Sequence, residues 1–258
     1  MINFYKYQGA GNDFILIDNR NDLFLLDKIE FAKKICCRRF GVGSDGVIFI
    51  ENHHSFDFEM DFFNPDGSKS FCGNGSRCAV AFAKYLAVFS ENKTVFEAID
   101  GRHEAEILGR QVKVNMNPVK TIEKIKNDYF LNTGSPHYIK YVNDFSELDI
   151  VEYGRSIRYS NQFKVNGTNV NIVKENSALS ISIKTYERGV EAETLACGTG
   201  ATACALSFAN NNKLTKGEVE VKAVGGDLKV FFEKESEGFK NIWLQGPAEF
   251  VFKGEFEI

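Results

Sequence analysis

Residues 71–78 have the sequence FCGNGSRC, and the interpretation of the whole chain starts from this stretch. Cys72 stands directly before a glycine-rich turn, and the apolar run Ala79–Val88 that follows predicts a helix. The unpaired N–H groups at the start of a helix, together with the positive end of its dipole, favour a thiolate over a thiol. The stretch therefore predicts a reactive cysteine at the N-terminus of a helix.

The same arrangement returns at residues 196–200, which have the sequence ACGTG and precede another run of small residues. The step from Cys72 to Cys197 is 125 residues, close to half of the 258-residue chain. Four glycine pairs share this step: Gly9 and Gly134, Gly73 and Gly198, Gly75 and Gly200, and Gly101 and Gly226. This common step predicts an internal duplication, with two similar halves that bring their helix starts to one interdomain cleft.

We expect the halves to span residues 1–117, with Cys72, and 118–258, with Cys197. The last strands, near 242–244 and 248–252, could return to either half. In the first half, Asp27 is expected to cap a helix over residues 28–40 that ends at Gly41. In the second, a helix is expected over residues 145–153. Apolar segments bounded by turn residues predict strands in both halves, which gives a mixed α/β chain.

Composition excludes several classes of function. The chain is 43% apolar and 26% charged, as in ordinary globular proteins, and its net charge of −4 gives no reason to expect nucleic acid. The sequence shows no signal peptide and no apolar run long enough for a membrane span, so we expect a cytoplasmic protein. The six cysteines form no C-x-x-C pair. They are expected to be reduced and to hold no metal.

The sequence GVGSDG at residues 41–46 matches the glycine fingerprint of dinucleotide-binding proteins. That fingerprint requires a strand before it and a helix after it, whereas here a helix precedes and a strand follows. We therefore expect no nicotinamide or flavin cofactor.

Polar residues elsewhere allow more than one interpretation. His137 follows Ser135-Pro136 in a turn of the second half, where it is either functional or a satisfied structural histidine. Glu187 and Arg188 end a predicted strand. They form either a surface ion pair or a site in which Glu187 binds an ammonium group and Arg188 a carboxylate.

Two cysteines at two helix starts suggest proton transfer on both faces of one carbon atom. A thiolate on one face removes a proton while a thiol on the other face delivers one, which inverts a stereocentre without a cofactor. The glycine-rich turns would direct backbone N–H groups at a carboxylate. The same two thiols could instead form a redox pair.

Blocks of sequence along nearly the whole chain resemble the diaminopimelate epimerase family. They are GAGNDF at 9–14, FNPDGS at 63–68, CGNGSRC at 72–78, GSPH at 134–137, GTNVN at 167–171, YERG at 186–189 and ETLACGTG at 193–200. The resemblance implies two similar domains, each a mostly antiparallel sheet wrapped around a central helix. It also implies cofactor-independent interconversion of LL- and meso-2,6-diaminopimelate, on the route to lysine and peptidoglycan, and a possible homodimer.

The resemblance also implies the roles of individual residues. Cys72 and Cys197 match the catalytic base and acid, and Glu187 and His137 match polar residues that support them. The cradle for the α-carboxylate matches Gly73, Asn74, Gly198 and Thr199. The remaining substrate-binding positions match Asn12, Asn64, Asn169 and Arg188, with Glu187 counted among them. Two alternatives stay open: a racemase for another amino acid on the same fold, and a thiol redox protein.

Overall fold

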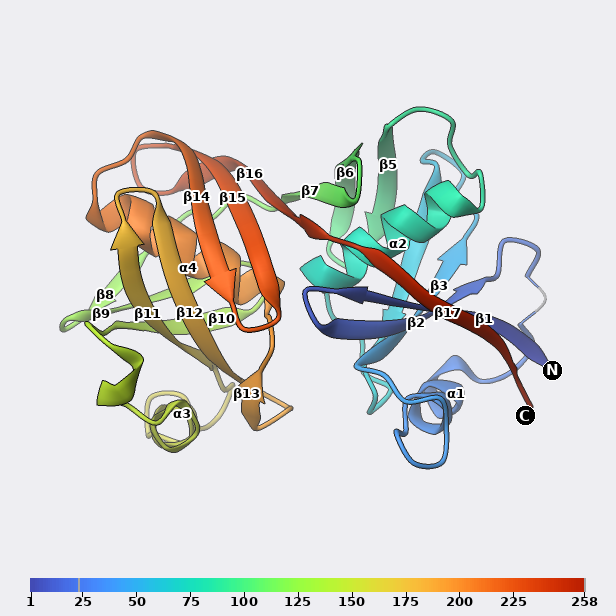
Figure 1. Ribbon diagram of the computed structural model, residues 1–258, viewed down its shortest axis with the longest axis horizontal. Coiled ribbons are helices and arrows are strands. Elements are labelled where there is room, and N and C mark those ends of the chain that lie inside the picture. The colour runs from blue at the N-terminus through green and yellow to red at the C-terminus, as the bar shows by residue number, and fades with distance from the viewer. Residues whose placement is uncertain (23, 258) are drawn as a thin grey trace. The chain divides into compact units, whose positions relative to one another are not determined.

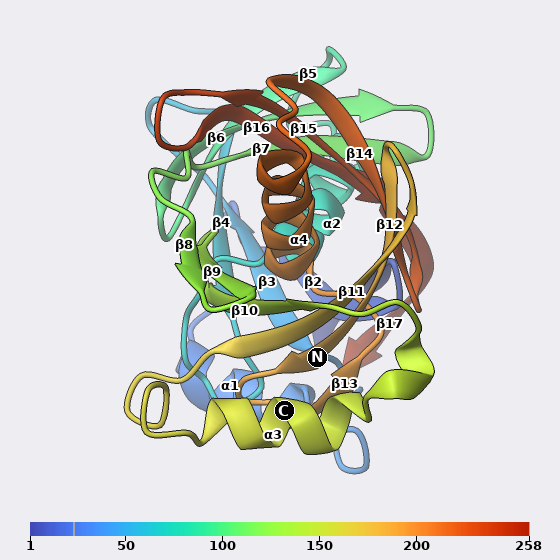
Figure 2. The same cartoon turned by 90° about the vertical axis from the view of Figure 1, so that its left-hand side faces the viewer.

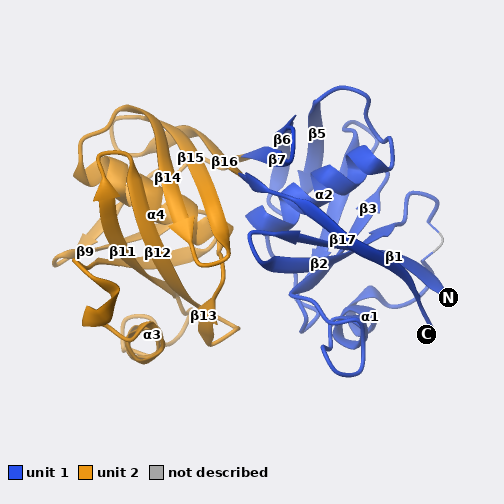
Figure 3. Cartoon of the chain, viewed as in Figure 1, with its two compact units in different colours: residues 1–114, 246–258 blue, residues 115–245 orange. Residues whose placement is uncertain are grey.

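In the computed structural model, which describes residues 1–22 and 24–257, the chain divides into two compact units (Figure 3). The first unit comprises Met1–Val114 and Gly246–Ile258, and the second comprises Asn115–Gln245. The C-terminal strand therefore belongs with the first unit, where it pairs with the first strand of the chain. Within the described part of the chain, no helix is long and apolar enough to cross a membrane.

The first unit is a sheet with two helices (Figure 1). Its elements are β1 (Ile2–Gly9), β2 (Asn12–Asp18), α1 (Lys28–Ile35), β3 (Gly46–Glu51), β4 (Phe58–Phe63), α2 (Gly73–Tyr85), β5 (Lys93–Ala98), β6 (Gly101–Leu108), most of β7 (Gln111–Met116) and β17 (Glu249–Phe256). The tight turn between β1 and β2 has positive φ at both Ala10 (56°) and Gly11 (82°), as a type I′ hairpin turn requires.

The second unit repeats this plan with one extra short strand. Its elements are β8 (Glu123–Ile125), β9 (Asp128–Asn132), β10 (Pro136–Tyr141), the 3₁₀ turn η1 (Phe145–Glu147), α3 (Ile150–Arg158), β11 (Asn169–Ser177), β12 (Ser180–Glu187), β13 (Ala192–Thr194), α4 (Gly198–Asn211), β14 (Lys216–Ala223), β15 (Gly226–Lys234) and most of β16 (Phe239–Pro247).

Strand pairing confirms the internal repeat. From β1 to β7 the successive pairs run antiparallel, parallel, antiparallel, parallel, antiparallel and antiparallel. Strands β9, β10, β11, β12, β14, β15 and β16 follow the same sequence of directions. Even the extra pairing matches, because β17 lies antiparallel to β1 as β8 lies antiparallel to β9.

Each sheet curves around one buried helix. Figure 2 shows α4 enclosed by the strands of the second unit, and every residue from Gly198 to Ala209 is buried. In α2, the run Gly73–Val80 is likewise buried. A helix that is buried on all sides needs small or apolar residues around its whole circumference, which explains the alanines and glycines of both segments. The start of each helix is thereby held rigidly inside its unit.

Two predicted helices differ from those observed. Helix α1 ends at Ile35 and not at Phe40, because the carbonyls of Ile35 and Cys36 accept from the N–H groups of Gly43 and Ser44, beyond the turn, and not from the next turn of a helix. Helix α3 begins at Ile150, after Asp149 caps the N–H groups of Val151 and Glu152, so the expected helix over residues 145–153 was placed too early.

One of the glycine matches is also wrong. Gly9 is the last residue of β1, whereas Gly134 lies in the turn after β9 with φ of 103°. The turn of the first unit has its corresponding glycine at Gly11 (φ 82°), which is 123 residues before Gly134. The helix starts and the β6 and β15 starts keep the common step of 125 residues.

Candidate active site

Cys72 is the N-cap residue of α2. Its backbone is extended (φ −129°, ψ 108°), and its Sγ accepts a hydrogen bond from the Gly75 N–H at 3.4 Å. The Cys72 carbonyl accepts from the Ser76 N–H at 2.8 Å and from the Ser76 hydroxyl at 2.9 Å. The partly buried sulfur therefore lies at the positive end of the helix dipole, where its anion is favoured.

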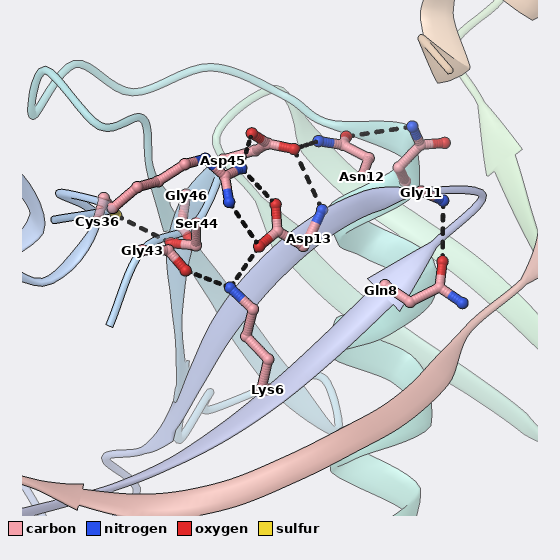
Figure 4. Close-up of polar contacts among 12 residues, drawn as sticks. Lys6, Gln8, Gly11, Asn12, Asp13, Cys36, Gly43, Ser44, Asp45 and Gly46 are labelled. Carbon is pink, nitrogen blue, oxygen red and sulfur yellow. Dashed lines mark hydrogen bonds and ion pairs between the residues drawn. The ribbon is translucent and has the colours of Figure 1, made fainter. Parts of the chain in front are cut away.

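The side chain beside Cys72 is Asn12, whose orientation is fixed by Asp45 (Figure 4). Asn12 Nδ2 donates to Asp45 Oδ2 at 2.6 Å. Because a carboxylate only accepts, Asn12 Oδ1 faces the other way, where it accepts from Asn74 Nδ2 at 3.2 Å and lies 3.9 Å from Cys72 Sγ. Arg38 Nη2 binds Asp45 Oδ1 at 2.7 Å and so holds the carboxylate in place.

Arg77 is a fully buried cation on α2, one turn beyond Cys72. Its Nε donates to the Pro247 carbonyl at 3.2 Å, while its Nη2 has no hydrogen-bond partner among the described residues. Burial lowers the pKa of Arg77 to about 10, and negative charge on Cys78 or Cys72 acts in the opposite direction. Arg77 remains charged at neutral pH, so it adds a second favourable influence on a Cys72 thiolate.

Asn64 lies in the turn after β4, and its side chain stabilises that turn. Its Nδ2 is 3.1 Å from the Ser68 carbonyl, from Ser68 Oγ and from Ser70 Oγ. These contacts order the segment that leads into Cys72. Asn64 thus shapes the loop before the thiol.

Cys197 is the N-cap residue of α4 and has nearly the same backbone conformation as Cys72 (φ −119°, ψ 114°). Its Sγ lies 3.4 Å from Thr199 Oγ1. The backbone of Thr199 is fixed from the other side, since the Thr133 hydroxyl donates to the Thr199 carbonyl at 2.8 Å. The second thiol is thus paired with a hydroxyl group, whereas the first lies near an amide oxygen.

His137 lies behind Thr199 and is fully buried. Its Nε2 is 3.0 Å from Thr199 Oγ1, and its Nδ1 is 3.1 Å from Asn171 Nδ2. Burial lowers the pKa of His137 to about 3, and the positive charge of Arg188 acts in the same direction. His137 is therefore neutral under physiological conditions, and it acts on its neighbours through hydrogen bonds.

The polar residues at the end of β12 are joined to the start of β10 through Asn169. Asn169 Oδ1 accepts from the Arg188 N–H at 2.9 Å, and Asn169 Nδ2 donates to the Pro136 carbonyl at 3.2 Å. The exposed guanidinium of Arg188 donates to the Asn166 carbonyl at 2.7 Å. Glu187, the last residue of β12, is partly buried.

Each unit thus holds one thiol at the start of a buried helix whose first N–H groups have no partner within the helix. In chemical terms each cluster can accept or donate a proton through sulfur and can bind an anion through backbone N–H groups. Among the described residues, no group of three or more His, Cys, Asp or Glu side chains could hold a metal ion. None of the six cysteines, all of them described, forms a disulfide.

The amino-acid sequence matches the family model described as diaminopimelate epimerase over residues 4–122 and 129–251, which covers both units. The chain belongs to the diaminopimelate epimerase family. A diaminopimelate epimerase of Flavobacterium psychrophilum is 47% identical over 251 residues, which are 96% of this chain and 98% of that protein. One from Aquifex aeolicus is 42% identical over 97% of this chain and 96% of that protein.

Solved structures show the same fold at low sequence identity. A phenazine biosynthesis protein of the PhzF family from Bacillus anthracis superimposes with a TM-score of 0.81 at 15% identity, covering 100% of this chain and 99% of that one. A probable proline racemase from Agrobacterium radiobacter K84 gives a TM-score of 0.74 at 14% identity over 100% and 93% of the two chains. The fold expected from the family resemblance is therefore confirmed.

For this member of the diaminopimelate epimerase family, the structure groups the residues proposed from sequence within each unit. Asn12 and Asn74 lie beside Cys72, and His137 and Thr199 lie beside Cys197. Asn64 instead contacts its own loop. Four further residues were not predicted from the sequence: Asp45 and Arg38, which orient Asn12, and Asn171 and Thr185, which lie behind His137. The alternation of Asn169 and Asn171 along β11 was the available signal, because it puts two amides on one face of a strand.

Proposed function

We propose that this chain is a diaminopimelate epimerase that interconverts the LL and meso isomers without a cofactor. The observation that carries the proposal is the pair of thiols, Cys72 and Cys197, each of which caps a buried helix at the same position of the two repeats. Membership of the diaminopimelate epimerase family supports diaminopimelate as the substrate, and with it a place in lysine and peptidoglycan precursor synthesis.

In the proposed reaction the two thiols act on opposite faces of the substrate α-carbon. The thiolate of one cysteine takes the α-proton, and the electron pair left on carbon is delocalised into the α-carboxylate. The thiol of the other cysteine then delivers its proton to the opposite face, which inverts the centre. Each turnover exchanges the protonation states of the two cysteines, so they titrate as a coupled pair.

The backbone N–H groups at the helix starts are proposed to hold the α-carboxylate. Gly73 and Asn74 offer them at α2, and Gly198 and Thr199 offer them at α4. Negative charge on the carboxylate grows as the α-proton leaves, so N–H groups that are already aimed at it stabilise the transition state more than the ground state.

The far end of diaminopimelate is itself an amino acid with an ammonium and a carboxylate group. We assign its binding to Asn12, Asn64, Asn169, Glu187 and Arg188, which between them offer amide groups and both signs of charge. Arg188 is suited to a planar carboxylate because its guanidinium can bind both oxygens, and Glu187 is suited to the ammonium group.

We further propose that the protein acts in the cytoplasm and as a homodimer. The support for a dimer is strand β17, one side of which pairs with β1 and whose Phe250, Val251 and Phe252 are 52%, 52% and 44% exposed. Such a strand is a natural partner for another copy of itself. Analytical ultracentrifugation of the wild type and of Val251→Lys tests this, and a monomeric wild type contradicts it.

The activity is tested by incubating the purified protein with LL-diaminopimelate, with pyridoxal phosphate removed and reductant present, and separating the isomers by chromatography. The proposal predicts formation of the meso isomer and its loss in Cys72→Ser and in Cys197→Ser. Turnover of a different amino acid in the same assay, with none of diaminopimelate, would favour a racemase of other specificity. A protein that isomerises nothing but changes its redox midpoint in both variants would favour a thiol redox protein.

A further inference from the structure

A chain of buried polar side chains runs from the sheet of the second unit to Cys197. It consists of Thr185 on β12, Asn171 on β11, His137 on β10 and Thr199 on α4, each of them between 0% and 5% exposed. Thr185 Oγ1 is 2.9 Å from Asn171 Oδ1, Asn171 Nδ2 is 3.1 Å from His137 Nδ1, and His137 Nε2 is 3.0 Å from Thr199 Oγ1.

The donor and acceptor roles in this series of hydrogen bonds are fixed at Asn171. The amide group that faces His137 also lies 3.2 Å from the Tyr138 carbonyl, which can only accept a hydrogen bond. That group must therefore be the NH₂ of Asn171, and it donates to His137 Nδ1 as well. The Thr185 hydroxyl donates to the remaining oxygen of the amide and holds it in this orientation.

The state of His137 follows from this contact. Because Nδ1 accepts, the single proton of the neutral ring is on Nε2, and it is donated to Thr199 Oγ1. The Thr199 hydroxyl accepts from the ring, which leaves its own proton available for Cys197 Sγ at 3.4 Å when that sulfur is a thiolate. Full burial of the imidazole keeps it in the neutral form that this pattern needs.

We propose that Asn171 and Thr185 are positioning residues that make Thr199 a hydrogen-bond donor to Cys197 and thereby stabilise the Cys197 thiolate. A hydrogen bond to the charged form of a group lowers the free energy of that form. Cys72 differs, since the Asn12 side chain directs an acceptor oxygen at its sulfur, which accepts from the backbone N–H of Gly75. The inference rests on the proposed function in that it concerns a thiol assigned to catalysis.

Other titratable and charged groups near these four side chains are Cys204 on α4 and Arg188 at the end of β12. Burial raises the pKa of Cys204 well above the usual thiol range, with Cys197 adding to the effect, so Cys204 is a neutral neighbour. Arg188 carries a positive charge that acts on His137. Neither group lies in the hydrogen-bond path from Asn171 to Cys197.

The first experiment determines the His137 tautomer by two-dimensional NMR of protein labelled with ¹⁵N-histidine, with His137→Gln identifying the signal. We expect a neutral ring with its proton on Nε2 at every pH between about 5 and 9. In Asn171→Leu, which removes the donor to Nδ1 at nearly constant volume, we expect this preference to be lost. A wild-type ring with its proton on Nδ1, or a charged ring at neutral pH, would overturn the proposal.

The second experiment measures alkylation of Cys197 by iodoacetamide against pH, resolved by tandem mass spectrometry in the absence of substrate. Asn171→Leu and Thr185→Val are expected to raise the pH at which Cys197 alkylation is half-maximal and to slow that alkylation at neutral pH by about tenfold. Alkylation of Cys72 should not change. Thr199→Ser keeps the hydroxyl and is expected to react like the wild type.

Thr202→Val is the matched control, because Thr202 is a buried threonine on the same helix whose hydroxyl donates to the Gly198 carbonyl at 2.9 Å. The proposal is contradicted if the rate of Cys197 alkylation falls equally in Thr202→Val, or if it does not fall in Thr185→Val and Asn171→Leu. If Asn171→Leu does not fold, Thr185→Val and the NMR signature decide. Epimerisation by the wild type is measured separately, so the failure of this inference is distinguishable from failure of the proposed function.

Discussion

At the scale of single residues, the two thiols have similar backbones but different surroundings. Cys72 lies beside the oxygen of Asn12 and near the buried charge of Arg77, whereas Cys197 lies beside the hydroxyl of Thr199 and the neutral ring of His137. A reaction in which one sulfur is charged while the other is neutral does not require equal environments. It requires that neither the thiolate nor the thiol form of a cysteine be stabilised so strongly that the proton cannot move. Neutral hydrogen-bond donors and acceptors meet this requirement better than a directly paired charge.

His137 gives a prediction about stability and pH. Its folded-state pKa of about 3 is below its ordinary value of 6.5, so between these pH values the unfolded chain binds more protons than the folded chain. Acidification therefore favours unfolding. Between pH 7 and pH 5 the wild type should lose about 2 kcal/mol more unfolding free energy than His137→Gln.

Urea denaturation of both proteins at the two pH values measures this difference, and the variant acts as the control for all other titrating groups. Equal losses in the wild type and in His137→Gln would mean that His137 is not held neutral by the folded protein.

At the scale of elements, α2 and α4 begin alike but tolerate different changes. A Cβ on Gly75 would lie 3.3 Å from Ile48 Cδ1 and 3.4 Å from Met60 Cε, both ends of flexible side chains. A Cβ on Gly200 would lie 2.8 Å from Asn171 Oδ1 and 3.2 Å from His137 Cε1, which belong to the hydrogen-bonded chain behind Cys197. The second helix is thus fitted against polar groups that cannot move without losing their partners.

Gly200→Ala and Gly75→Ala form a matched pair for testing this difference. We expect Gly200→Ala to reduce the unfolding free energy by about 1–3 kcal/mol and to reduce epimerisation strongly, because it displaces Asn171. Gly75→Ala should cost less than about 1 kcal/mol, since the gain in helix propensity offsets a mild contact. Thermal melts and initial rates measure both effects, and equal behaviour of the two variants would contradict this account.

At the scale of the whole molecule, the first unit is completed by the end of the chain. Strand β17 pairs with β1 from Ile2 to Gln8, and Phe252 packs edge-on against Phe4 with ring centroids 6.0 Å apart. Phe256 also packs on the core cluster that contains Phe31 and Phe49. The first unit therefore cannot reach its final structure until residues 249–256 have been synthesised.

Removal of residues 249–258 should therefore destabilise the protein far more than its short length suggests. We expect the unfolding free energy to fall by about 3 kcal/mol or more, because aromatic contacts between β17 and the rest of the unit are lost. The uncovered edge of β1 should also promote aggregation. A chain shortened only by residues 257–258 is the control. Comparable melting temperatures for the two truncated chains would show that β17 contributes little.

Much of this organisation could be predicted from the sequence, because it depends on local signals. Glycine turns and small-residue runs identified both helix starts, and the repeated step of 125 residues identified the duplication. The early end of α1 could not be predicted, because it depends on backbone hydrogen bonds from residues outside the helix, those of the Gly43 and Ser44 N–H groups to the Ile35 and Cys36 carbonyls. Asn171 and Thr185 were missed for the same reason, since their role depends on the register between β10, β11 and β12.

The central claim, that two thiols act on opposite faces of one carbon, is tested most directly by deuterium labelling. LL-diaminopimelate is converted by the wild type in D₂O, and the label at the α-carbon is followed by mass spectrometry during the first few per cent of reaction. We predict that the meso product carries deuterium at the inverted carbon while the remaining LL substrate carries almost none, and that either cysteine-to-serine variant slows the conversion by at least about 100-fold. Product that retains the original hydrogen, or a serine variant that epimerises at the wild-type rate, would contradict a mechanism with two cysteines.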